Sequence, residues 1–152
     1  MLALHKILVP TDLSVCSTRA LDEAHEFARQ FSASIDLLYV WTMPALVAPE
    51  SLITGMGINE QPLMAWMESS ARELLSRFEE QAKNAGIEVN TSCCERGDPA
   101  TTIVEHATQG GYDLLVLGTH GRTGIAHAVL GSVAEKVVRS APCPVLTVRT
   151  TD

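Results

Sequence analysis

The stretch DLLVLGTHGRTGIAHAVLGSVAEKVV, residues Asp113–Val138, decides how this chain folds. It opens with the apolar run Asp113–Leu117, which is typical of a central strand buried on both faces. A glycine-rich segment follows, and apolar residues at helical spacing between Val129 and Val138 then predict a helix that Ser132 opens. A buried strand that leads through a loop into a helix is the repeating unit of an α/β protein with a parallel sheet.

The same alternation extends over the rest of the chain. Further strands are predicted at His5–Val9, Ile35–Trp41, Ile87–Cys93 and Pro142–Val148. The third of these alternates like an edge strand, and the prolines of the last place it at an edge or make it start late. Residues 1–152 are therefore predicted to be one α/β domain, in which a five-stranded parallel sheet carries helices on both faces in a Rossmann-like fold. In such sheets, ligands bind beyond the C-terminal ends of the strands, where the strand order reverses.

Capping residues and breakers mark the boundaries of the predicted elements. Ser17 is predicted to cap the first helix, and Asp98 to cap a later one with proline in its first turn. Between them, apolar spacing over residues 71–85 predicts an amphipathic helix that ends at Gly86. Residues 42–62 contain scattered prolines and glycines and are predicted to form a flexible loop or lid.

The composition limits the classes of function. Eighteen acidic and eleven basic side chains give a net charge of −7, and no Lys/Arg-rich run is present, so nucleic-acid binding is not expected. The four cysteines, at positions 16, 93, 94 and 143, lack zinc-site spacing and are expected to be reduced and mostly buried. No apolar run approaches the roughly 20 residues of a membrane span and no signal peptide is recognisable, so we expect a cytoplasmic protein without membrane contact.

Two interpretations of the glycine-rich segment remain open from the residues alone. Glycine lets a ligand approach the main chain closely, and a helix N-terminus favours anions, so the segment that leads to Ser132 can cradle a phosphate. Alternatively, Ser132 and Glu135 match the capping box S-x-x-E, which would satisfy the helix amides without a ligand. Neither the P-loop motif nor a G-x-G-x-x-G turn after the first strand is present.

The glycine spacing resembles that of the universal stress protein family. The nucleotide-binding branch of that family carries the motif G-x2-G-x9-G-[S/T], matched here by Gly118, Gly121, Gly131 and Ser132. Three other segments also look like family segments: HKILVPTDLS at His5–Ser14, RGDPATTIVEHA at Arg96–Ala107 and APCPVLTVR at Ala141–Arg149. The resemblance thus covers the whole chain, and it implies an adenine-nucleotide alpha-hydrolase-like fold that binds ATP.

The resemblance also implies which residues hold the nucleotide. Residues that end the first two strands would contact base and ribose, with the Asp12 carboxylate at the sugar hydroxyls; they are Pro10, Thr11, Asp12 and Val40. Residues from the end of the fourth strand onward would line the ribose and the phosphates; they are Leu117, Gly118, His120, Gly121, Arg122, Gly131, Ser132 and Val133. His120 either bonds to the ligand or braces the loop. A Mg²⁺ ion would be held mainly by the ATP phosphates, with no metal ligands from the protein.

A regulatory role is expected rather than a catalytic one. Asp12 is the only strong carboxylate candidate and is expected at the ribose, with His120 and Arg122 as possible helpers, so ATP hydrolysis is expected to be slow at most. The hypothesis is an ATP-dependent switch that orders residues 42–62, pairs as a homodimer through strand 144–148 and acts on an unknown regulatory protein partner.

Two other readings of the residues stand beside this hypothesis. One is a nucleotide-free dimeric interaction module of the same fold, which would use Met56, Met64 and Met67 to bind proteins. The other is an adenylyl-transferring or flavin-binding enzyme. Such an enzyme would need an acceptor-substrate pocket or a flavin, and no residues in the sequence indicate either. Ala134 departs from the family pattern, since relatives often carry a small hydroxyl residue there.

Overall fold

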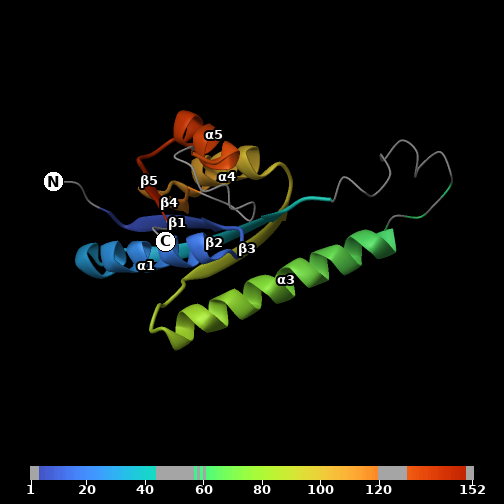
Figure 1. The fold of residues 1–152 in the computed structure, drawn as a ribbon, viewed down its shortest axis with the longest axis horizontal. Helices are drawn as coiled ribbons and strands as arrows, with labels where there is room; N and C mark the ends of the chain where they lie inside the picture. Colours follow the sequence, from blue (N-terminus) through green and yellow to red (C-terminus); the bar gives the residue numbers. More distant parts are fainter. Residues whose placement is uncertain (1–3, 44–56, 58, 60, 120–129, 150–152) are drawn as a thin grey trace.

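A computed structural model describes residues 4–43, 57, 59, 61–119 and 130–149, and these form a parallel sheet covered by helices on both faces (Figure 1). The strands are β1 (Lys6–Thr11), β2 (Ser34–Trp41), β3 (Thr91–Arg96), β4 (Leu114–Gly118) and β5 (Val145–Val148). The helices are α1 (Val15–Phe31), α3 (Gln61–Asn84), α4 (Pro99–Gly110) and α5 (Ser132–Ser140). The predicted α/β class with a five-stranded parallel sheet is therefore confirmed. None of the helices described is long and apolar enough to cross a membrane.

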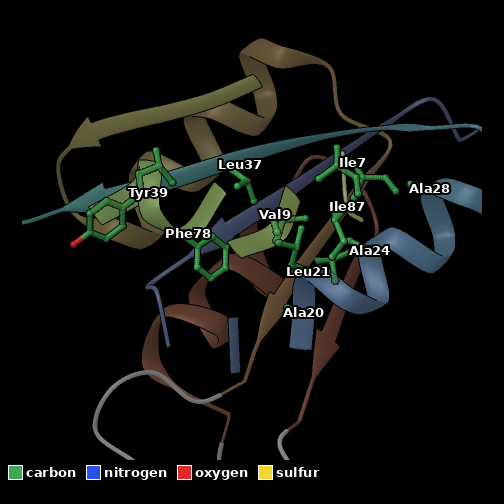
Figure 2. Close-up of a cluster of buried hydrophobic side chains, with 14 of the residues drawn as sticks. Ile7, Val9, Ala20, Leu21, Ala24, Ala28, Leu37, Tyr39, Phe78 and Ile87 are labelled. Carbon is green, nitrogen blue, oxygen red and sulfur yellow. The ribbon is translucent and has the colours of Figure 1, made fainter. Parts of the chain in front are cut away.

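Side chains at alternate positions of the strands point to opposite faces of the sheet and contribute to two separate hydrophobic cores. Ile7, Val9 and Leu37 point toward α1 and α3, as Figure 2 shows, while Leu8 and Leu38 point toward α4 and α5. All five side chains are fully buried. A strand covered on both faces carries apolar residues at consecutive positions, which is why β1, β2 and β4 read as continuous apolar runs.

The strand order is β3-β2-β1-β4-β5, so β1 is central and the order reverses between β1 and β4. β1 pairs with β2 along its whole length, but its pairing with β4 is recorded only at Ile7–Leu114 and Leu8–Leu115. Beyond that point lies Pro10, which has no amide hydrogen to donate. The C-terminal ends of β1 and β4 are therefore the switch point at which ligands bind in such sheets.

Several predicted boundaries differ from those of the structure. β3 begins at Thr91 rather than at Ile87, because the Ile87 amide donates to the Ala82 carbonyl of α3 at 2.9 Å and its side chain is buried in the α1/α3 core. β5 begins only at Val145, beyond the two prolines, in agreement with the expectation that the prolines make this strand start late. α3 begins at Gln61, so the last two residues of the predicted 42–62 loop are helical; most of that loop lies outside the described residues.

The first helix is capped by Ser14, and the prediction of Ser17 as its cap is wrong. The Ser14 hydroxyl accepts a hydrogen bond from the Ser17 amide at 3.2 Å, which makes Ser17 the third residue of the helix. The prediction for the fourth helix is confirmed, since the Asp98 side chain accepts from the Thr101 amide and Pro99 stands in the first turn. The described cysteines are free, but only Cys16 is buried.

A buried carboxylate, Asp36, lies under α4 in the middle of β2. It accepts hydrogen bonds from the Asn90 amide group (2.8 Å), the Thr91 main chain (3.1 Å) and the Tyr112 hydroxyl (3.0 Å), and the Lys6 ammonium lies 3.5 Å away. Burial alone would raise its pKa, but these hydrogen bonds and the Lys6 charge outweigh burial and lower the pKa. Burial in turn raises the pKa of Tyr112, which keeps that hydroxyl a donor.

We expect Asp36 to make stability depend on acid pH. Its folded pKa lies below the ordinary aspartate value of 3.8, so its contribution is present above that pH and is lost as pH falls through the folded pKa. Asp36→Asn should lower the free energy of unfolding by about 1–3 kcal/mol near neutral pH, and the deficit should shrink in acid. Urea unfolding across this range measures both. The exposed Asp22→Asn is the control; a deficit that persists undiminished in acid would contradict the assignment.

Candidate functional site

A cavity of about 270 Å³ opens at the switch point, between the C-terminal ends of β1 and β4 and the start of α5. The strands supply its floor, α4 supplies one wall, and the first turn of α5 supplies another. Its lining residues are Pro10, Thr11, Asp12, Ser17, Leu38, Val40, Pro99, Ile103, Leu117, Gly118, Thr119, Gly131, Ser132, Val133 and Ala134. The site thus gathers residues from six elements that are far apart in the sequence.

Every predicted site residue that the structure describes lines this cavity. They are Pro10, Thr11, Asp12, Val40, Leu117, Gly118, Gly131, Ser132 and Val133. The three other predicted residues, His120, Gly121 and Arg122, lie outside the described residues.

Sequence reasoning missed several lining residues, for which only weak signals exist. Leu38 stands two positions before Val40, so the strand period places both on one face. Ile103 belongs to the apolar face of α4, and nothing in the sequence shows that this face reaches the site rather than only the core. The others missed are Ser17, Pro99, Thr119 and Ala134.

One side of the cavity is an apolar wall. It consists of Leu38 and Val40 of β2, Leu117 of β4, Ile103 of α4 and Val133 of α5. Leu38, Ile103 and Leu117 are also members of the α4/α5 core, so the wall is held by the packing of the domain. A flat apolar group, such as an aromatic base, would bury its faces here at little cost.

Asp12 also lines the cavity, and its carboxylate is held in a tightly bonded turn. Its Oδ1 atom accepts from the Ser17 hydroxyl at 2.5 Å and from the Ser14 amide at 3.0 Å. The Thr11 hydroxyl accepts from the Leu13 amide at 3.0 Å, and Leu13 takes a left-handed φ of 66°, which is rare for leucine. The turn after β1 is therefore held in one conformation, and the carboxylate with it.

The first turn of α5 also lines the cavity, and the capping box that one interpretation placed there is absent. Gly131, which has no side chain to cap the helix, is the cap residue, and Ser132 is already the first helical residue. The Glu135 carboxylate instead lies 2.8 Å from the Arg139 guanidinium, one turn further along. The first main-chain bond of the helix runs from Glu135 N to Gly131 O, so the amides of the preceding turn have no partner within the helix.

The two motif glycines that the structure describes are required by packing within the protein. A Cβ on Gly118 would lie 2.6 Å from Cys16 Sγ, at the start of α1. A Cβ on Gly131 would lie 2.7 Å from the carbonyl oxygen of Thr119, to which the Gly131 amide donates at 2.8 Å. We expected these glycines to admit a ligand; in the structure they let β4, α1 and α5 approach one another, and that approach shapes the cavity.

These features define a class of protein. A parallel sheet whose strand order reverses above a cavity, with a helix N-terminus at its rim, is characteristic of doubly wound α/β proteins that bind their ligands at this point. The model of the universal stress protein family matches residues 3–149, and the chain belongs to this family. The resemblance seen in the sequence is thereby confirmed.

Three relatives illustrate the match. The universal stress protein MJ0531 of Methanocaldococcus jannaschii is 35% identical over 144 residues, which cover 95% of this chain and 81% of that protein. The solved structure of protein MJ0577 from the same organism has a TM-score of 0.78 at 27% identity and covers 99% of both chains. A universal stress protein in complex with cAMP has a TM-score of 0.65 at 27% identity, covering 98% of this chain and 99% of that one.

Proposed function

We propose that this chain binds ATP with Mg²⁺ in the cavity between β1 and β4 and acts as a nucleotide-dependent regulatory switch in the stress response. The observation that carries the proposal is the lining of one cavity, which combines an apolar wall, the Asp12 carboxylate and the first turn of α5, whose cap residue is a glycine. In this proposal the apolar wall takes the base, the Asp12 carboxylate takes the ribose, and the first turn of α5 takes the phosphates. The cAMP complex of a relative with the same fold supports the choice of an adenine nucleotide.

A partner in the cavity can be assigned to each part of the nucleotide. The base packs on Leu38, Val40 and Ile103; Asp12 accepts from the sugar hydroxyls; and the amides at Ser132 and Val133 donate to a phosphate with the dipole of α5 behind them. The described residues contain no group of three or more His, Cys, Asp or Glu side chains that could hold a metal ion. We propose that a Mg²⁺ ion at this site is held mainly by the phosphates, whose oxygens are good ligands for it.

A switch fits this site better than an enzyme. Asp12 is the only acidic residue among the described lining residues, and its proposed role is to accept from the ribose, so no other described carboxylate of the lining is placed to activate water. We infer hydrolysis that is slow at most. The further elements of the proposal are ordering of residues 42–62 on binding, a homodimer through 144–148, a cytoplasmic location and a regulatory protein partner.

The direct test is the nucleotide content of the purified protein. Acid denaturation followed by anion-exchange chromatography of the supernatant should release about one adenine nucleotide per chain, or the empty protein should gain thermal stability from ATP and Mg²⁺. At a ligand concentration of about one hundred times Kd, the gain is about 2.7 kcal/mol. Parallel scans with ADP, AMP and cAMP rank the preference.

No released nucleotide and no thermal shift with any of the four would overturn the proposal in favour of the nucleotide-free interaction module. The described methionines of that alternative, Met64 and Met67, are half-buried and pack against the α1/α3 core, so they serve the fold first.

A further inference from the structure

We propose that Ser17 is a positioning residue that aims the Asp12 carboxylate at the ribose and so lets the site discriminate between ATP and analogues that lack one ribose hydroxyl. The inference rests on the proposed function, because it concerns how the same site reads the sugar. It starts from a hydroxyl that the sequence suggests is a helix cap and that the structure places elsewhere. Ser17 is 4% exposed and lines the cavity beside Asp12.

The hydrogen bonds of Ser17 can be assigned from chemistry. Ser17 Oγ lies 2.5 Å from Asp12 Oδ1 and 3.0 Å from the Asp12 amide nitrogen. A carboxylate only accepts, so the single hydroxyl hydrogen of Ser17 goes to Oδ1. The Asp12 amide then donates back to the Ser17 oxygen. The Ser17 side chain thus forms hydrogen bonds with both the main chain and the side chain of Asp12.

These hydrogen bonds fix the plane of the Asp12 carboxylate. An aspartate side chain rotates broadly about its last torsion, since that torsion has no sharp staggered wells. Here Oδ1 accepts from two directions at once, from the Ser17 hydroxyl and, at 3.0 Å, from the Ser14 amide. With Oδ1 held by these two bonds, the orientation of the Asp12 carboxylate is set before any ligand arrives. Preorganised acceptors of this kind make stronger and more directional bonds to a hydroxyl pair.

The hydroxyl of Ser17 is not needed for the helix. Ser14 already caps α1 through its own side chain, which accepts from the Ser17 amide. Alanine is also the best helix former, so α1 itself would tolerate it at position 17. The role of this hydroxyl in holding Asp12 can therefore be separated from the formation of α1.

The test compares ATP, 2′-deoxyATP and 3′-deoxyATP, each with Mg²⁺, by calorimetric titration of the whole protein. We expect the wild type to bind at least one deoxy analogue about tenfold more weakly than ATP, which is the loss of one charge-assisted hydrogen bond. In Ser17→Ala that ratio should fall below about threefold, mainly through weaker ATP binding. Ser17→Cys, which keeps the size of the side chain but donates weakly, serves if the alanine variant fails to fold.

Control variants separate positioning from stability. Thr18→Ala removes a hydroxyl from the same turn of α1, where it bonds only to the Ser14 carbonyl at 3.3 Å, and it should keep the wild-type ratio. Asp12→Asn should reduce the ratio as Ser17→Ala does, and the double variant should lose little more, because both act on one interaction.

The outcomes are distinct. A Ser17 variant that weakens ATP and both analogues equally would overturn the inference, because a merely structural role leaves the ratio unchanged. A wild type that binds ATP without discriminating against either analogue would also overturn it, while leaving the proposed function in place. A wild type that binds none of the three would overturn the inference together with the proposed function.

Discussion

Replacing Gly118 with alanine is expected to lower the free energy of unfolding by about 3 kcal/mol, at the upper end of the usual cost of overpacking. The new Cβ would lie 2.6 Å from Cys16 Sγ, 3.1 Å from Cys16 Cβ and 3.2 Å from the Cys16 carbonyl carbon. The last contact is with main chain at the start of α1, so rotating the Cys16 side chain cannot relieve it. Urea unfolding followed by circular dichroism measures the loss.

A second substitution tests whether this contact is the cause. Cys16→Ala removes the sulfur that would lie closest to the new Cβ, and by itself should cost about 1 kcal/mol as a buried side chain is shortened. The double variant should be more stable than the sum of the two single changes predicts, by about 0.5–2 kcal/mol. Strict additivity would show that Gly118 is required for another reason.

The stability of these variants would show whether the motif glycines serve packing within the protein rather than phosphate binding. If Gly118 and Gly131 serve the approach of neighbouring segments, substitutions at these positions report stability before they report nucleotide binding. A loss of ligand in such variants would not identify a phosphate cradle. A substitution that leaves the packing intact is needed for that purpose, and the exposed first residue of α5 offers one.

Ser132→Glu is expected to weaken ATP binding at least a hundredfold while the protein stays folded. Two unit charges about 4 Å apart repel by about 4 kcal/mol at the effective dielectric of a protein surface, which exceeds what a hundredfold loss requires. The fold should tolerate the change, because Ser132 is exposed and a glutamate at a helix N-terminus is favoured by the dipole. Calorimetric titration with ATP and Mg²⁺ measures the affinity, and thermal unfolding checks the fold.

The matched control is Ser140→Glu, which adds the same charge to the other end of α5. Ser140 is exposed and does not line the cavity, so ATP affinity should change less than threefold even though the net charge changes equally. If the two variants lost affinity equally, the effect would come from net charge. If Ser132→Glu bound ATP as tightly as the wild type, the phosphates would not lie at the N-terminus of α5.

Much of the fold could be predicted from the sequence because its local signals agree with one another. Continuous apolar runs mark β1, β2 and β4, since strands buried on both faces need no polar positions. The Asp98–Pro99 pair correctly marks the start of α4, since capping depends on residues a few positions apart. The predicted site residues that are described also gather in one cavity, because parallel strands bring their C-terminal ends to the same edge of a sheet.

Other features could not be predicted because they depend on segments that meet only in space. Ser14 and Ser17 are equally good caps by type, and the choice between them follows from Asp12, which engages the hydroxyl of Ser17. Ile87 alternates like a strand residue but is drawn into the α1/α3 core, so β3 starts later.

The sequence by itself determined the α/β class, the family, the central strands and the residues that approach the site from the strand ends. These follow from periodicity and short-range chemistry, which act within a few residues. Only the tertiary structure decided that Gly118 packs closely against Cys16, that Gly131 rather than Ser132 is the cap residue of α5, and that the Ser17 hydroxyl bonds to Asp12. The reason is physical: close packing and hydrogen-bond partners depend on distances between segments, and no local pattern of residues encodes those distances.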